Sequence, residues 1–138
     1  MGIQFHPGQG VVVICDYSTG FVIPEMVKRR PAIIICKPMK GRPRLCTVVP
    51  LSTTPPSPVM NYHAEIALPF DLPRPFNAER QWIKGDMINS VSFDRLDLIR
   101  LGKAVSGRRL YLLEPISDDL MQTVQACVAS ALSLTKRP

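Results

Sequence analysis

Short apolar runs rich in β-branched residues, separated by proline and glycine, dominate the first half of the chain. Residues 11–17, 31–37 and 44–51 each centre on consecutive apolar residues, and residues 60–68 alternate between apolar and polar side chains. Runs of this length and composition are typical of strands. We therefore expect four strands here, with the second and third joined as an antiparallel hairpin by the short polar loop 38–43.

Pro31 sets the position of the second strand. Because proline lacks a backbone N–H and is tolerated at the first residue of a strand, we expect the strand to begin at Pro31. The ring of Pro31 also disfavours a helical backbone at Arg30, the residue before it. An arginine held at the start of a rigid strand can be oriented toward a ligand, so Arg30 is the first candidate functional residue.

The pattern is less regular in the second half of the chain. Gly85 interrupts the apolar segment 81–91, which predicts a strand that is bulged or bent at that point. Residues 93–99 predict a short helical turn, and residues 109–113 predict a last edge strand. These elements would complete the sheet.

Residues 117–134 predict the one long helix. Ser117 can cap its start, and apolar residues recur on one face with the helical period. Lys136 and Arg137 follow its C-terminal end, where cations are favourable. Together the patterns predict a mainly β fold in a single domain over residues 1–138, a small barrel of bent antiparallel strands closed by a C-terminal α-helix.

The composition is that of an ordinary soluble globule, with 46% hydrophobic and 20% charged residues. No apolar run approaches the ~18–20 residues that a membrane span requires, and the N-terminus lacks the pattern of a signal peptide, so we expect a cytoplasmic location and no membrane contact. The four cysteines have no C-x-x-C spacing. We expect them to be buried thiols and expect no disulfide, metal or cofactor.

The net charge of +6 is unevenly distributed, because the chain has seven cations and no acid from Lys28 to Arg44. Most charge runs are solvated faces, but an unbalanced basic surface beside a β-rich core also fits a nucleic acid or an acidic protein segment. Six of these side chains are candidates for contacts with a nucleic-acid backbone: Lys28, Arg29, Lys37, Lys40, Arg42 and Arg44.

Four motifs follow one another along the first hundred residues: PGQGVVV at 7–13, RPAIII at 30–35, VVPLSTT at 48–54 and DMINSV at 86–91. Each motif alone is weakly specific, since a proline-led apolar strand is common. In this order, and followed by a C-terminal helix, they resemble the PemK/MazF-like toxins of bacterial type II toxin–antitoxin systems.

The resemblance implies an SH3-like barrel, a homodimer, and cleavage of single-stranded RNA, such as mRNA, at short sequences without a metal ion. It places the family's catalytic pair on Arg30 and Ser52. Thr53 is an alternative to Ser52, because further hydroxyls follow directly and leave a one-residue ambiguity. Glu25 matches an acidic residue that the family has in the preceding loop.

Metal-free RNA cleavage can use the substrate's own 2′-hydroxyl as nucleophile, so the protein must supply a base, an acid and a group that stabilises the charged phosphorane. Arg30 suits the last role, because its fork donates two hydrogen bonds and it is a poor base. Ser52 can orient or donate to a phosphate oxygen. Glu25, Asp86 and His63 remain open as the base, and Asp86 is also a candidate RNA contact.

We therefore expect an RNA-cutting toxin that also binds an acidic antitoxin protein. Met26 and Met87 stand where many members of the family have glutamine, so the resemblance does not carry over the target sequence. The alternative is a non-enzymatic binding protein on the same barrel, which inhibits a protein target or only holds its antitoxin. That alternative gains if Arg30 or Ser52 proves buried or turned away from any groove. The purely structural readings are that Arg30 contacts carbonyls or pairs with Asp16, and that Ser52 and Thr53 cap the end of their strand.

Overall fold

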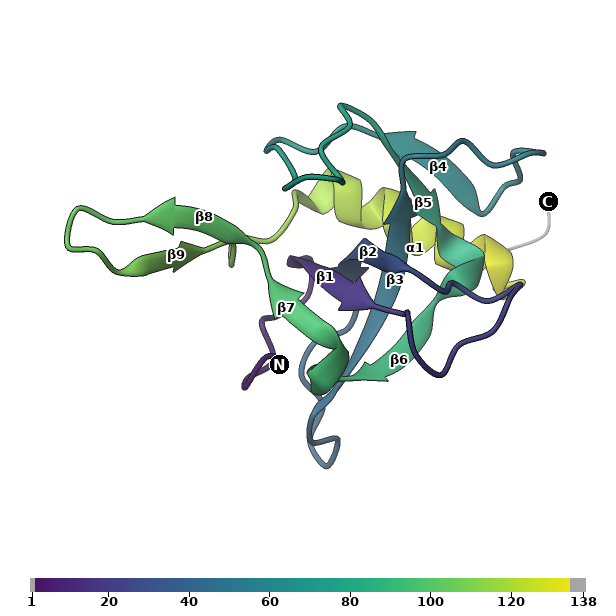
Figure 1. Cartoon of the computed structure of the whole chain (residues 1–138). Helices are drawn as coiled ribbons and strands as arrows, with labels where there is room; N and C mark the ends of the chain where they lie inside the picture. The colour runs from purple at the N-terminus through teal and green to yellow at the C-terminus, as the bar shows by residue number, and fades with distance from the viewer. Residues whose placement is uncertain (1, 135–138) are drawn as a thin grey trace.

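An antiparallel sheet of seven strands, with one helix packed on it, forms the body of the protein (Figure 1). The computed structural model describes residues 2–134. The strands run in the order β4-β5-β3-β2-β1-β7, and β6 pairs with β3 beside β5. The elements of this body are β1 (Val12–Asp16), β2 (Arg29–Ile34), β3 (Leu45–Ser52), β4 (His63–Ile66), β5 (Gln81–Lys84), β6 (Asn89–Ser92), β7 (Leu96–Leu98) and α1 (Asp118–Ala131).

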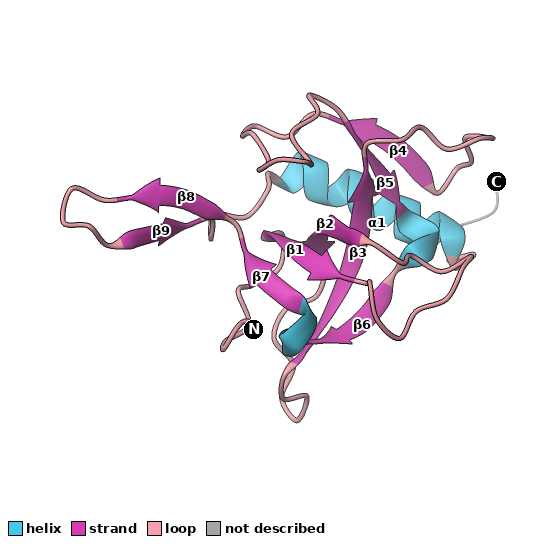
Figure 2. Ribbon diagram, in the orientation of Figure 1, coloured by secondary structure: helices cyan, strands magenta, loops and turns pink. Residues whose placement is uncertain are grey.

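The sheet is buried on both faces. Side chains alternate along β1, so Val12 and Ile14 pack in a cluster with residues of α1, whereas Val13 and Cys15 pack in a second cluster on the opposite face. Burial on both faces explains why the sequence shows continuous apolar runs here rather than strict alternation. The mainly β architecture with one C-terminal helix, predicted from the sequence, is confirmed (Figure 2).

β3 is the centre of the sheet. One of its edges pairs with β2, in an antiparallel register that sets Ala32 opposite Pro50 and Ile34 opposite Val48. The other edge pairs with β6 and then with β5. Between these two strands the chain makes a 3-10 turn at Gly85–Met87, so the predicted hairpin of strands two and three and the predicted bend at residue 85 are both confirmed.

The predicted start of β2 is wrong by two residues. β2 begins at Arg29, and Pro31 lies within it, opposite Ile14 of β1. Pairing of β2 with β3 begins only at Ala32. The missing N–H of Pro31 therefore interrupts no ladder on the β3 side, which is why a proline is tolerated inside this strand.

Three other elements differ from the sequence prediction. The helical turn expected over residues 93–99 is limited to Phe93–Arg95, and the chain then forms β7, which pairs with β1. The expected strand at 60–68 is reduced to β4. The expected last edge strand is β9 (Arg109–Tyr111), which pairs with β8 (Arg100–Lys103) in a separate two-stranded sheet and not at the edge of the main one.

The predicted C-terminal helix is confirmed, although it ends before residue 134. The Ser117 hydroxyl accepts a hydrogen bond from the N–H of Leu120 at 3.2 Å and caps the helix. The buried face of α1 carries Val124, Cys127 and Val128. The predicted contacts of Lys136 and Arg137 with the helix end lie outside the described residues. No helix between residues 2 and 134 is both long and apolar enough to span a membrane.

All four cysteines are free thiols. Burial raises the pKa of Cys15 to about 11 and that of Cys46 to about 12. Thiols held in this protonated form are poor nucleophiles and poor metal ligands. In the described part of the chain, no group of three or more His, Cys, Asp or Glu side chains is placed to hold a metal ion.

Candidate functional site

Arg30 lies opposite Cys15 of β1. By strand alternation its side chain is on the same face as Ala32, the face turned away from α1. The Nε–H of Arg30 is buried and has no hydrogen-bond partner. Among residues 2–134 no ion pair involves Arg30, so it does not pair with Asp16. A buried donor without an acceptor is costly, and an anion that supplied the acceptor would therefore be bound favourably.

Ser52 is the last residue of β3. Continuing the register that pairs Ala32 with Pro50 by two residues places Ser52 opposite Arg30, at the same end of the hairpin. Ser52 is only 6% exposed. Its Oγ accepts a hydrogen bond from the N–H of Thr54 at 3.1 Å and lies 3.5 Å from the carbonyl oxygen of the same residue. Ser52 thus has the position expected of a partner for Arg30, but its hydroxyl is already hydrogen-bonded to the backbone just after the end of the strand.

Thr53 follows directly after β3 and is exposed to solvent. The two hydroxyls that the sequence left as alternatives therefore differ in kind. Ser52 is buried in register with Arg30, whereas Thr53 is accessible but lies beyond the last paired residue of the strand. As the catalytic hydroxyl, Ser52 is favoured by its position opposite Arg30, whereas Thr53 is favoured because a substrate can reach its side chain.

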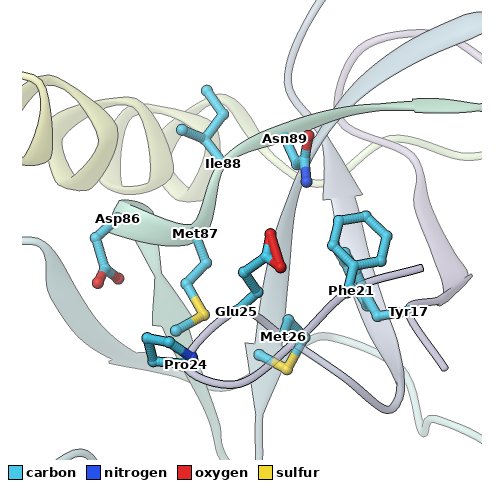
Figure 3. A pocket seen from close by; sticks show the side chains of 9 residues that line it. All are labelled: Tyr17, Phe21, Pro24, Glu25, Met26, Asp86, Met87, Ile88 and Asn89. Carbon is cyan, nitrogen blue, oxygen red and sulfur yellow. The ribbon is translucent and has the colours of Figure 1, made fainter. Parts of the chain in front are cut away.

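Glu25 lies in the loop between β1 and β2, where two hydrogen bonds to Val22 hold it. Its Oε1 accepts a bond from the Val22 N–H at 2.7 Å, and its own N–H donates to the Val22 carbonyl at 2.7 Å. The carboxylate stands at the wall of a pocket of about 440 Å³, shown in Figure 3. The pocket is lined by Tyr17, Phe21, Pro24, Glu25, Met26, Asp86, Met87, Ile88 and Asn89.

This pocket joins the β1–β2 loop to the turn between β5 and β6. Its polar groups include the carboxylates of Glu25 and Asp86 and the amide of Asn89, and its apolar lining includes Phe21. Carboxylates and an amide oxygen accept hydrogen bonds, and an aromatic ring offers a stacking surface. The pocket can therefore receive a flat ring that carries N–H donors. Arg30 is not among the lining residues, although Phe21 packs on the cluster of the same sheet face.

Asp86 is exposed, and one of its oxygens lies 3.9 Å from Nε2 of His63. The Nδ1 of His63 accepts a hydrogen bond from the N–H of Met60 at 3.0 Å. Burial, followed by the charge of Lys84, lowers the pKa of His63, while Asp86 acts in the opposite direction. A histidine with one nitrogen occupied and a side chain 8% exposed is poorly placed as a base. Of the three candidate bases, Glu25 and Asp86 share the pocket.

The seven cations from Lys28 to Arg44 fall into two groups. Three lie at the start of β2, and four lie in the loop after its end. Six residues, 31–36, separate the groups along the chain. At the usual rise of a strand this is a distance of roughly 20 Å. The structure therefore does not gather these candidates into one surface.

Three of the candidate RNA contacts already have partners within the protein. Arg29 lies 3.6 Å from Asp97, and Arg44 forms an ion pair of 2.6 Å with Asp94. Arg42 donates to two hydroxyls, those of Thr47 at 3.0 Å and Ser90 at 3.2 Å. Lys28, Lys37 and Lys40 are exposed.

Tyr17, Phe21 and Asn89 were missed as functional candidates by reasoning from the sequence. They line the pocket from two segments far apart in the chain, and only the pairing of the strands brings those segments together. One signal did exist. Met26 and Met87 were the two departures from the resembled family, and both line this pocket.

Comparison with known families identifies the class of protein. The chain belongs to the family described as PemK-like, MazF-like toxin of type II toxin–antitoxin systems, whose model matches residues 8–132. A relative of similar length is the uncharacterized protein YifN of Escherichia coli (strain K12), which is 28% identical over 156 residues, covering 96% of each protein.

Solved structures share the fold at low sequence identity. MazF from Deinococcus radiodurans (Form-I) superposes with a TM-score of 0.61 at 18% identity, covering 94% of this chain and 99% of that one. An endoribonuclease from Mycobacterial species, solved in complex with its cognate antitoxin, superposes with a TM-score of 0.60 at 20% identity, covering 96% and 100%. The fold of this chain is thus that of MazF-like proteins.

Proposed function

We propose that this protein is a toxin that cuts single-stranded RNA as a metal-independent endoribonuclease. We also propose that a single domain is responsible for this activity. The observation that carries the proposal is the state of Arg30. Its Nε–H is buried without an acceptor, and Ser52 would lie opposite it if the β2–β3 register continued by two residues. An arginine fixed in this way has donors free for a phosphate, whose oxygens its planar fork matches.

The proposed reaction needs no group outside the substrate and the protein. The 2′-oxygen of the RNA attacks the adjacent phosphorus and loses its proton to a base, and the bond to the 5′-oxygen of the next nucleotide breaks as that oxygen gains a proton. Arg30 binds the phosphate oxygens, on which negative charge increases in the transition state. Ser52 donates to one of these oxygens, and Glu25 is the proposed base, because its carboxylate is held at the pocket wall.

The pocket beside Glu25 is the proposed binding site for an RNA nucleobase near the cleaved bond. It combines acceptors on Glu25, Asp86 and Asn89 with the ring of Phe21. Lys28, next to the start of β2, is exposed, has no ion pair among the described residues and would bind backbone phosphate. Lys37 and Lys40, at the far end of β2, would contact a more distant part of the strand.

An antitoxin is the expected protein partner. One of the similar structures is an endoribonuclease bound to its cognate antitoxin. For this chain, with its net charge of +6, we propose an acidic antitoxin segment that competes with RNA for the exposed lysines. We also propose that the toxin acts as a homodimer in the cytoplasm.

The test is incubation of the purified protein with a long single-stranded RNA in EDTA, beside the variant Arg30→Ala. We expect cutting by the wild type and a loss on the order of a hundredfold or more in the variant, as for removal of a group that stabilises transition-state charge. Arg74→Ala is the matched control, because it removes one exposed arginine that has no proposed contact with RNA. Equal cutting by wild type and Arg30→Ala, or cutting by neither, contradicts the proposal.

A second candidate is a non-enzymatic binding protein on the same fold, and one observation favours it. Ser52 is 6% exposed and its hydroxyl is bonded to Thr54, so the catalytic pair is not open as it stands. In this reading the cations only hold an acidic antitoxin or another protein. Binding of a labelled acidic peptide by a wild-type protein that leaves RNA intact is the result expected from this second function.

A further inference from the structure

A hairpin projects from the body of the protein (Figure 1). Its strands β8 and β9 pair only with each other, in a two-stranded sheet of their own. At its base, the N–H of Leu112 donates to the carbonyl of Ile99 at 2.8 Å. An isolated two-stranded hairpin is marginally stable in water, so contact with a partner would stabilise an arm of this kind.

One face of this hairpin is cationic. The antiparallel register sets Lys103 directly opposite Arg109, and Arg100 opposite Tyr111. Like charges directly opposite each other on a pair of strands are destabilising. No acid lies between Asp97 and Glu114 to offset them. An anion placed on this face would relieve the repulsion, whereas a second basic surface would increase it.

Tyr111 adds a stacking surface to the same face. It is 38% exposed and shares its register position with Arg100. Cations interleaved with an exposed aromatic ring are the combination by which proteins hold single-stranded nucleic acid, since the cations meet phosphates and the ring meets a base. An acidic peptide would use the cations but would have no base to stack on the ring.

A hollow lies at the base of the hairpin. It has a volume of about 460 Å³, and the residues that line it include Arg29, Asp97, Arg100 and Tyr111. Arg29 and Arg30 are consecutive residues of β2, so their side chains lie on opposite faces of the sheet, and Arg29 pairs with Asp97 at 3.6 Å. The cationic face of the hairpin is therefore a surface separate from Arg30.

We infer that the face of the β8–β9 hairpin with Arg100, Lys103, Arg109 and Tyr111 binds a part of the RNA strand that lies away from Arg30. This inference rests on the proposed function and adds to it a second, sequence-independent contact outside the cutting site. The hairpin holds the strand on one side of the cleaved bond, and Arg30 acts on the bond itself.

The first test measures binding of a fluorescent 2′-O-methyl RNA, which cannot be cut, at several salt concentrations. For the double variant Lys103→Ala/Arg109→Ala we expect weaker binding and a slope of log K against log salt that is smaller by about 1.4, from two lost phosphate contacts on a single strand. The control is Arg74→Ala/Arg80→Ala, which removes the same charge outside the hairpin and should leave the slope as in the wild type.

RNAs of two lengths distinguish binding at the hairpin from binding at the cutting site. A strand of about twenty nucleotides should lose affinity in the double variant, whereas one of about six nucleotides, which fills only one site, should bind and be cut as by the wild type. Tyr111→Leu should weaken binding of the long strand about tenfold, and Tyr111→Phe, which keeps the ring, should not.

Two results overturn the inference while leaving the proposed function intact. One is an unchanged salt slope in the hairpin variant of a protein that binds and cuts RNA. The other is a change of oligomeric state in sedimentation with RNA binding unchanged, which would make the hairpin a contact between proteins. If the wild type neither binds nor cuts RNA, the proposed function itself fails together with the inference.

Discussion

The hydroxyl of Ser52 accepts a hydrogen bond from the backbone N–H of Thr54 at 3.1 Å, at the point where β3 ends. The bond ties the residue in register with Arg30 to the backbone of the following segment. If Ser52 assists Arg30, its O–H must turn from the Thr54 carbonyl, 3.5 Å away, toward a phosphate oxygen. A contact of that length is weak, so turning the hydroxyl costs little.

Ser52→Ala is therefore expected to lower the rate of RNA cutting on the order of a hundredfold, because it removes a donor to the charged transition state. Thr53→Ala is the paired variant and is expected to cut nearly as the wild type does, because Thr53 lies beyond the paired strand. Single-turnover cleavage rates, with folding checked by circular dichroism, measure both. A larger loss in Thr53→Ala would move the catalytic hydroxyl by one residue.

Glu25 offers a clean test of the proposed base. In Glu25→Gln the amide oxygen can still accept the bond from the Val22 N–H, so the loop keeps its shape while the basic group is lost. We expect cutting to fall by about a hundredfold or more, with little change in RNA binding. Asp86→Asn, in the turn between β5 and β6 that also lines the pocket, is the comparison. If only Asp86→Asn abolishes cutting, the base is Asp86.

Gly85 connects the packing of α1 to the pocket. A Cβ atom at this position would lie 2.7 Å from the backbone carbon of Cys127 and 2.8 Å from the carbonyl oxygen of Tyr62. Backbone atoms cannot move aside cheaply, so Gly85→Ala should destabilise the protein by about 1–3 kcal/mol.

Urea denaturation measures this loss. Because Asp86 to Asn89 follow directly, RNA cutting by the folded Gly85→Ala variant should also fall. A variant of full stability would show that the turn moves freely against the helix.

The elements that were predicted correctly depend on local signals. Gly85 inside an apolar segment marks the bend, and Ser117 before a period of 3.6 residues marks the helix. The prediction of a helical turn over 93–99 is confirmed only for its first three residues, because residues 96–98 become a strand through pairing with β1. Tertiary pairing of this kind leaves little trace in a short segment.

Some features of the candidate site could likewise be predicted from the sequence, and others could not. Arg30 and Ser52 could be placed together from the sequence, because a hairpin brings the start of one strand to the end of the next. The separation of Lys28 from Lys40 follows from the same hairpin and could have been foreseen. The pocket between the Glu25 loop and Asp86 could not, because it depends on where β6 joins β3.

His63 predicts how stability depends on pH. Its pKa in the folded protein is lowered, chiefly by burial and then by Lys84, below the value of about 6.5 expected in the unfolded chain. The unfolded state therefore binds the proton more readily, and stability is full above pH 6.5 and falls as the pH drops toward the lowered pKa. We expect the urea midpoint to decrease from about pH 7.5 to about pH 5.5.

His63→Asn is the matched variant, because the asparagine oxygen can replace Nδ1 as acceptor of the Met60 N–H. It should lose less stability over this interval than the wild type. The pKa of His6 is also lowered, by burial and by the charge of Arg42, so His6→Asn is measured beside it. If His63→Asn keeps the full acid dependence of the wild type, His63 is not the group that titrates, and the difference between the two variants divides the effect between the two histidines.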